Sequence, residues 1–119
     1  MKKLICSLFA LSALSTAVAQ EVNIKILGTS DVHGRIVPWS YGADVEDKSG
    51  SYAQIATYVK DVRKNNKNVV LVDVGDAIQD NQVDVFAKDK KYYKDHPIPK
   101  VLNEMKYDVF VLGNHEFNF

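Results

Sequence analysis

Hydrophobic and polar positions divide the chain into three short apolar runs, separated by longer segments of mixed character. The first run, residues 21–30, alternates apolar and polar side chains, and this alternation is typical of a strand. The runs at residues 69–74 and 107–112 are mostly apolar and rich in β-branched residues, as expected for buried parallel strands. The sequence therefore predicts three strands.

Two segments between these runs have helical features. The first helix is predicted to begin at Ser51, because Ser51 and Gln54 have the spacing of a capping box. The second is predicted to begin at His96-Pro97, since proline is favoured in the first turn of a helix. The apolar faces consist of Ile55, Tyr58, Val59 and Val62 in the first helix and of Val101, Leu102 and Met105 in the second.

The remaining segments are predicted to be connections. Residues 36–50 are expected to form a loop, and residues 83–87 a helical turn. The charged residues 88–95 are predicted to be solvated surface, with a functional basic patch as the less favoured interpretation. The order β-α-β-α-β indicates an α/β fold in which right-handed crossovers join parallel strands.

The first nineteen residues have the features of a secretory signal peptide. Lys2 and Lys3 form a basic start, residues 4–13 are mostly apolar, and Ala17-Val18-Ala19 supplies small residues for cleavage before Gln20. The apolar core is too short for a permanent membrane anchor. The predicted signal peptide leads us to expect export to the periplasm or the extracellular space. A short buried helix is the alternative interpretation of residues 1–19.

Composition narrows the classes of function. The only cysteine, Cys6, lies inside the predicted signal, which leaves residues 20–119 without a disulfide or a thiolate metal site. Without Lys2 and Lys3, 13 basic residues remain against 15 acidic residues, a net charge of −2. This balance gives no reason to expect binding to a nucleic-acid polymer or a membrane surface. The length allows one small domain at most.

Metal-binding side chains follow each predicted strand. Asp31 and His33 come after the first strand, Asp76 after the second, and Asn114 and His115 after the third. Because the carboxyl ends of parallel strands meet at one edge of a sheet, these side chains are expected to lie together. Each alone is more typical of a turn or a cap. Together they form a donor set suited to zinc, manganese, iron or cobalt.

The three strand ends also resemble a known family, the calcineurin-like metallophosphoesterases. The matching motifs, in order and spacing, are Asp31-Val32-His33, Gly75-Asp76 and Gly113-Asn114-His115-Glu116. The longer strings at residues 29–35, 75–79 and 113–118 are similar to those of the exported 5'-nucleotidase and 2',3'-cyclic-nucleotide 2'-phosphodiesterase branch. The resemblance implies the amino-terminal part of an α/β/β/α sandwich, incomplete within this chain.

This resemblance also implies roles for the five donors. Asp31 and His33 would hold the first of two divalent metal ions, Asp76 would bridge both ions, and Asn114 would hold the second. His115 would be the catalytic histidine, which stabilises phosphoryl oxygens or protonates the leaving oxygen. Two ions about 3.5–4 Å apart clamp the attacking and leaving oxygens. The substrate would be a nucleotide or a cyclic nucleotide.

Three positions modify this expectation. Asn118 stands where the 5'-nucleotidase branch usually has an aspartate beside the catalytic histidine. This favours a 2',3'-cyclic-nucleotide 2'-phosphodiesterase/3'-nucleotidase over a 5'-nucleotidase/UDP-sugar hydrolase. Glu116 is expected to orient its loop, with a free surface carboxylate as the close alternative. Arg35 is expected to form a surface salt bridge, with a phosphate contact as the alternative.

The family places further metal-binding histidines after these motifs, whereas the histidines here are His33, His96 and His115. Residues 20–119 are therefore expected to be the amino-terminal portion of a metallophosphoesterase domain, inactive and weakly metal-binding alone. The competing hypotheses are an exported metal-binding module without catalysis and an α/β scaffold with coincidental turn residues. The sequence that follows Phe119 would separate the enzyme from the module.

Overall fold

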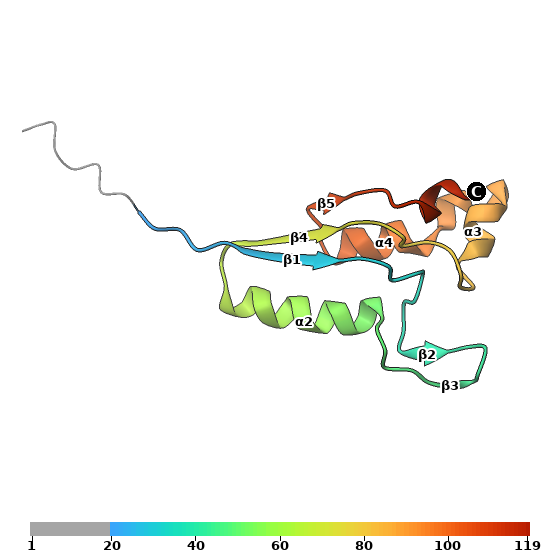
Figure 1. Cartoon of the computed structure of the whole chain (residues 1–119), viewed down its shortest axis with the longest axis horizontal. Helices are drawn as coiled ribbons and strands as arrows, with labels where there is room; N and C mark the ends of the chain where they lie inside the picture. The colour runs from blue at the N-terminus through green and yellow to red at the C-terminus, as the bar shows by residue number, and fades with distance from the viewer. Residues whose placement is uncertain (1–19) are drawn as a thin grey trace, which may run out of the picture.

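The computed structural model describes residues 20–119 as an α/β fold around a parallel sheet of three strands. The strands are β1 (Lys25–Thr29), β4 (Val69–Asp73) and β5 (Val109–Phe110), in the spatial order β1-β4-β5 (Figure 1). The parallel pairing and the order of strands and helices confirm the predicted fold class. The predicted signal peptide, residues 1–19, lies outside the described residues.

All three strands are shorter than the sequence predicted, β4 only by its last residue. β1 begins at Lys25 because this residue lies opposite Val69, where β4 begins, and residues 21–24 therefore have no ladder partner. β5 ends at Phe110, which lies opposite the last residue of β4, Asp73. One further bond continues the pairing, from Val111 N–H to Asp73 O at 2.9 Å. The β4 strand thus limits the length of both neighbours.

Two helices connect the strands. α2 (Tyr52–Asn65) begins after Ser51, whose Oγ accepts the Gln54 N–H at 3.4 Å and donates to Gln54 Oε1 at 2.9 Å. α4 (Pro97–Glu104) begins after His96, whose Nδ1 accepts the Ile98 N–H at 3.3 Å. Both predicted helix starts are confirmed. The caps satisfy backbone donors that would otherwise lack a partner in the first turn.

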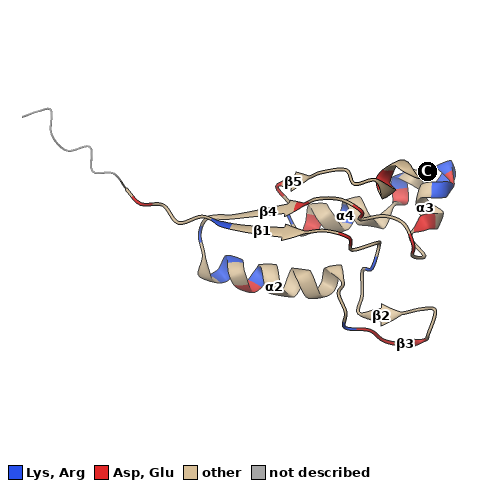
Figure 2. Ribbon diagram, viewed as in Figure 1, with Lys and Arg blue, Asp and Glu red and all other residues tan. Residues whose placement is uncertain are grey.

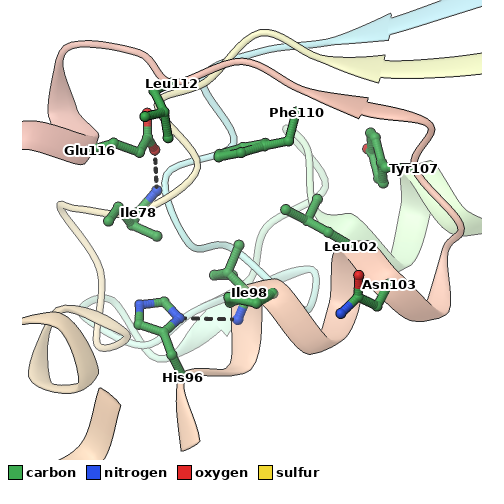
Figure 3. A pocket seen from close by; sticks show the side chains of 10 residues that line it. Ile78, His96, Ile98, Leu102, Asn103, Tyr107, Phe110, Leu112 and Glu116 are labelled. Carbon is green, nitrogen blue, oxygen red and sulfur yellow. Dashed lines mark hydrogen bonds between the residues drawn. The ribbon is translucent and has the colours of Figure 1, made fainter. Parts of the chain in front are cut away.

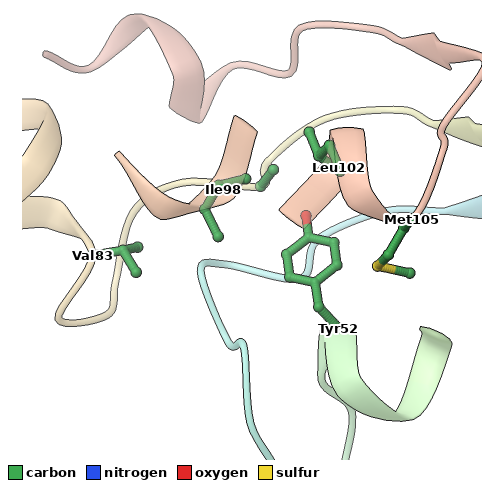
Figure 4. Packing of buried hydrophobic residues seen from close by; sticks show 6 residues of the cluster. Tyr52, Val83, Ile98, Leu102 and Met105 are labelled. Atoms are coloured by element: carbon green, nitrogen blue, oxygen red, sulfur yellow. The ribbon is translucent and has the colours of Figure 1, made fainter. Parts of the chain in front are cut away.

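The core lies between the two helices on one side of the sheet. The buried cluster consists of Tyr52, Ala77, Val83, Ile98, Leu102 and Met105 (Figure 4). Tyr52 comes from α2 and Ile98 from α4, and each is only 1% exposed. The three strands follow one another across the sheet in chain order. Two right-handed crossovers therefore place both helices over the same face.

One predicted core position is wrong. Tyr58 was expected on the buried face of α2, but it is 64% exposed. β1 is an edge strand, and Tyr58 lines an open cavity beside its residues Ile26 and Leu27. Tyr52 is buried instead at the start of the helix, where it reaches the core shared with α4.

The predicted connections contain more regular structure than expected. Within residues 36–50, β2 (Trp39–Ser40) and β3 (Val45–Glu46) form an antiparallel hairpin, so the prediction of a plain loop is wrong. The polar run gave no alternating pattern from which a strand could be recognised. The helical turn at 83–87 is confirmed as α3 (Asp84–Lys88). The charged segment is largely exposed, as predicted, but forms the 3-10 helix η2 (Lys90–Asp95).

The opposite face of the sheet is apolar and lacks a covering helix within residues 20–119. Alternation along the strands, with Ile26 opposite Val70 and Val72 opposite Val109, identifies the side chains that share it. We call this surface the open face; it consists of Ile24, Ile26, Val70, Val72, Val74, Val109 and Val111. Ile26 is 73% exposed, whereas Leu71, on the covered face, is fully buried.

Charged residues are intermixed along the described chain, with Lys and Arg spread over several elements (Figure 2). Among residues 20–119, none of the helices combines the length and the apolar character needed to cross a bilayer.

Candidate metal centre

The centre is built where the loops after β4 and β5 touch. Gly75 has φ +97°, and a Cβ placed there would overlap the backbone of Gly113. A Cβ on Gly113 would in turn overlap Asp76. Only glycine permits both this backbone conformation and this close approach. The two Gly-containing motifs therefore place Asp76 directly beside Asn114 and the residues that follow it.

The loop after β1 joins the same edge of the sheet through backbone hydrogen bonds. We call this edge the rim; it comprises residues 31–34, 75–80 and 113–118. Asp31 N–H donates to Gly75 O at 3.0 Å, and His33 N–H donates to Asp76 O at 3.0 Å. Asp31, His33 and Asp76 all have φ between 48° and 56°, in the left-handed region that non-glycine residues rarely adopt. Such conformations cost about 1–3 kcal/mol each and are concentrated at functional sites.

Three donor side chains converge at this rim. His33, Asp76 and His115 each offer a ligand atom, and these atoms lie within 4.8 Å of one another. The rings of His33 and His115 meet edge to face with centroids 5.1 Å apart. His33 Nδ1 is buried without a hydrogen-bond partner, and Asp80 Oδ2, at 3.9 Å, is too far to supply one. The unpartnered nitrogen and the mixed donor set fit a divalent metal ion.

The other two predicted ligands lie at the same rim, outside this group of three. Asp31 is exposed and is held by its backbone bond to Gly75. Asn114 is also exposed and forms the N-terminal cap position of the 3-10 helix η3 (His115–Phe117). The described structure thus brings together His33, Asp76 and His115.

Glu116 ties the loops after β4 and β5 together. Its Oε2 accepts the Gly113 N–H at 2.7 Å and the Asp76 N–H at 2.8 Å. Its Oε1 accepts the Ala77 N–H at 2.7 Å and the Ile78 N–H at 3.3 Å. One carboxylate therefore satisfies four backbone donors, and it orients the loops rather than lying free on the surface. This supports the first of the two interpretations drawn from the sequence.

One amide side chain, Gln79, contacts the ring of His115, and a second, Asn118, contacts Gln79 and lies beside the ring. His115 Nδ1 lies 2.5 Å from Gln79 Oε1, and Asn118 Nδ2 donates to the same oxygen at 2.5 Å. The backbone N–H of His115 donates to Asp76 Oδ1 at 2.9 Å. Sequence reasoning assigned no role to Gln79, although it ends the matched string at residues 75–79.

Arg35 forms the surface ion pair that the sequence predicted. Its Nη1 lies 3.2 Å from Asp47 Oδ2 and also contacts the Ser49 hydroxyl. Hydrogen bonds from Ser49 lower the pKa of Asp47, and the Arg35 charge lowers it further. A cavity of about 260 Å³, lined in part by Asp31, His33 and Arg35, lies beside the rim.

Another cavity, of about 410 Å³, lies between α4 and β5 on the covered side of the sheet. Its lining is mostly apolar and includes Ile98, Leu102 and Phe110 (Figure 3). His96 also lines it, and burial lowers the pKa of this imidazole. The cavity contains none of the three converging donors, and we regard it as part of the packing beneath the rim.

A second aspartate of β4 supports the rim from below. Asp73 is fully buried; its Oδ2 accepts the Thr29 hydroxyl at 2.6 Å, and its Oδ1 accepts the Gly75 N–H at 2.9 Å. Burial raises the pKa of Asp73, although its two hydrogen bonds oppose the shift. Asp73 and Asp76 therefore differ in role: one fixes strand ends inside the fold, and the other faces the centre.

Comparison with known proteins assigns this chain to a family. The calcineurin-like phosphoesterase model matches residues 24–119, and the chain belongs to that family. The sequence is 39% identical over 111 residues to the trifunctional nucleotide phosphoesterase protein YfkN of Bacillus subtilis, covering 87% of this chain and 8% of that protein. A 2',3'-cyclic-nucleotide 2'-phosphodiesterase/3'-nucleotidase of Haemophilus influenzae is 37% identical, with 95% of this chain and 18% of that protein covered.

Further comparisons agree with this assignment. A snake venom 5'-nucleotidase of Naja atra is 35% identical, with 80% of this chain and 17% of that protein covered. The crystal structure of calcineurin-like phosphoesterase YfkN from Bacillus subtilis matches with a TM-score of 0.71 and 40% identity. That match covers 80% of this chain and 30% of the solved chain. The present chain thus spans less than a fifth of the length of these curated relatives.

Proposed function

We propose that this chain supplies part of the active site of an exported two-metal phosphoesterase that hydrolyses nucleotides. The preferred substrates are 2',3'-cyclic nucleotides and 3'-nucleotides. The observation that carries the proposal is the convergence of His33, Asp76 and His115 at the carboxyl rim of the sheet, in a chain of this family. Residues 20–119 would form the amino-terminal portion of the metallophosphoesterase domain.

The proposed metal ligands are Asp31, His33, Asp76 and Asn114. When bound, a pair of divalent ions (zinc, manganese, iron or cobalt) supplies positive charge and Lewis acidity at the phosphoryl group. Asp76 lies after the middle strand, between the loops of β1 and β5, and from there it would be the carboxylate shared by the two ions. Asp31, His33 and Asp76 share a left-handed backbone conformation, and this conformation sets the direction in which each loop presents its side chain.

His115 is the proposed catalytic residue. Its backbone N–H bond to Asp76 and its side-chain contact with Gln79 hold the ring at the rim, beside His33. From this position the imidazole can hydrogen-bond a phosphoryl oxygen or give a proton to the leaving oxygen. Glu116 keeps the loops that carry Asp76 and His115 at a fixed separation, because it binds backbone groups of both.

The substrate class rests on Asn118 and on the names of the relatives. In this chain an amide, rather than a carboxylate, lies next to the His115 ring, at 3.2 Å from Nδ1. The Haemophilus relative is named for 2',3'-cyclic-nucleotide and 3'-nucleotide hydrolysis, which agrees with this difference. A 5'-nucleotidase or UDP-sugar hydrolase is the second candidate, favoured by the identity to the Naja atra 5'-nucleotidase.

The test compares specificity constants of the protein encoded by the complete reading frame. We expect kcat/KM for 2',3'-cyclic AMP and 3'-AMP to exceed that for 5'-AMP and UDP-glucose. A higher value for 5'-AMP would favour the second candidate. Metal binding without turnover of any of these substrates would favour a non-catalytic metal-binding module.

A further inference from the structure

The contact between His115 and Gln79 requires one group to donate a hydrogen and the other to accept it. Gln79 Oε1 is a carbonyl oxygen, which can only accept, so His115 Nδ1 must carry the hydrogen of the 2.5 Å contact. Asn118 Nδ2 can only donate, so it cannot take that hydrogen, although it lies 3.2 Å from the same ring nitrogen. It donates instead to Gln79 Oε1, whose second lone pair is free to accept it.

With the Asn118 amide oriented as in the structure, its NH2 group also agrees with the direction of the Gln79 amide. If the amide were reversed, its NH2 group would meet the NH2 group of Asn118, and two donors would oppose each other. The observed arrangement pairs both donors, His115 Nδ1–H and Asn118 Nδ2–H, with one oxygen. Asn118 thus acts on His115 through Gln79 and not as its direct partner.

The backbone places Gln79 for this contact at a conformational cost. Gln79 has φ +109° and Asp80 has φ +64°, both uncommon for residues other than glycine. The same loop carries Asp76, which accepts the His115 backbone N–H. One loop after β4 therefore holds both the main chain and the ring of His115.

We propose that Gln79 is a positioning residue that keeps His115 in the Nδ1–H tautomer, with the Nε2 lone pair free. In a histidine paired with a carboxylate, the negative charge of the partner stabilises the imidazolium. A neutral amide fixes the tautomer and the ring orientation without that charge. The tautomer assignment stands on geometry alone, whereas its effect on turnover rests on the proposed phosphoesterase function.

The first test is ¹⁵N NMR of the histidine rings in the purified full chain without metal, at about pH 8.5, two units above the ordinary histidine pKa. The His115 signals are assigned by comparison with a His115→Gln variant. We expect His115 to carry its hydrogen on Nδ1 in the wild-type chain. A wild-type His115 that carries it on Nε2 would overturn the proposal without any variant being needed.

Variants then identify the acceptor. Gln79→Met keeps the length of the side chain but removes the acceptor, and we expect His115 to lose its preference for Nδ1–H. Gln79→Glu restores an acceptor and is expected to restore the wild-type tautomer. Gln82→Met, on an exposed residue of the same segment, is the control for changes in folding. An unchanged tautomer in Gln79→Met would contradict the role of Gln79.

The catalytic consequence is measured separately in the enzyme from the complete reading frame. Loss of a group that orients a metal-binding side chain typically costs 10–100-fold in metal affinity or activity, and we expect a similar scale for the positioned His115. We therefore expect Gln79→Met to lower kcat roughly 10–100-fold, with KM within about twofold. An unchanged kcat would refute the catalytic part of the proposal. A wild-type enzyme inactive on every nucleotide would refute the proposed function and leave the tautomer result standing.

Discussion

The rim and the open face both lie at the surface of residues 20–119, but they differ in what holds their residues. At the rim, which comprises residues 31–34, 75–80 and 113–118, polar groups from separate loops are joined by hydrogen bonds. On the open face, apolar side chains such as Ile26 and Val109 project from the two edge strands and remain 73% and 47% exposed. The rim has the connected polar groups of a chemical site, whereas the open face has the composition of a packing surface.

This difference shows which parts of the fold are determined within residues 20–119. The geometry of the rim depends on glycines and on Glu116, all inside the described chain. The apolar residues of the open face have no such partners there. The strands are apolar on both sides, as in sheets covered by other elements on each face, but the helices α2 and α4 cover only one side.

The largest expected effect follows from adding one methyl group at the rim. In Gly75→Ala the new Cβ would overlap the Gly113 backbone, and φ +97° would strain the alanine. Overpacking and backbone strain each cost about 1–3 kcal/mol, so we expect a loss of about 3 kcal/mol or more. Gly28→Ala, where a Cβ meets nothing within 4 Å, is the control. Urea unfolding that gives equal stabilities for the two variants would contradict the close contact of the loops.

The next effect separates the two faces of the sheet. Leu71→Ala removes a fully buried side chain, and a loss of about 2–5 kcal/mol is expected. Ile26→Ala removes a side chain that is 73% exposed, and the cost should stay below about 1 kcal/mol. The same unfolding experiment compares them. A cost for Ile26→Ala close to that for Leu71→Ala would mean that the open face is covered in solution.

A smaller effect is expected from changing one oxygen of Glu116. In Glu116→Gln an NH2 group replaces an acceptor and leaves two backbone N–H groups without a partner. Leaving such donors unsatisfied costs about 1–3 kcal/mol. Glu104→Gln, on the exposed side of α4, is the matched control. In the first variant only, we expect faster hydrogen exchange at one of the two pairs, either Asp76 and Gly113 or Ala77 and Ile78. Equal exchange rates in the two variants would remove Glu116 from the rim network.

The smallest effect concerns the dependence of stability on pH. Burial raises the pKa of Asp73 above its ordinary value of 3.8, so the folded state holds this proton to higher pH than the unfolded state. The contribution of Asp73 to stability therefore falls as the pH rises from the unfolded pKa through the folded pKa. Asp73→Asn removes this dependence, so the stability of the variant relative to the wild type should increase as the pH rises above the ordinary aspartate pKa of 3.8. A difference between the two proteins that stays constant with pH would contradict a raised pKa.

Local pattern was enough to predict most of the sheet and the helix starts. Both helix starts are signalled within a few residues of the sequence. The signals are the capping pair Ser51 and Gln54 for α2 and the proline at the start of α4. The hairpin at Trp39–Glu46 could not be predicted, because its two-residue strands are too short to show alternation. The prediction for Tyr58 was wrong because helical periodicity defines an apolar stripe along the helix, but not which residues of that stripe meet a neighbouring element.

The site could be predicted only as far as strand order allows. Donors at three parallel strand ends must share one edge, which brought His33, Asp76 and His115 together as expected. The contacts of Glu116 and Gln79 could not be predicted, because they depend on side chains that cross between loops about 40 residues apart. Sequence spacing alone carries no information about such contacts.

The central claim is that the rim binds a divalent metal ion around Asp76. The most direct measurement is paramagnetic broadening of the backbone NMR signals of the chain by Mn²⁺, which detects even weak binding. We predict broadening concentrated at residues 31–34, 75–80 and 113–118 in the wild-type chain. Asp76→Asn should abolish it, whereas Asp61→Asn, at an exposed position on α2, should leave it unchanged. Broadening spread over the whole surface, or retained at the rim in Asp76→Asn, would contradict the metal centre.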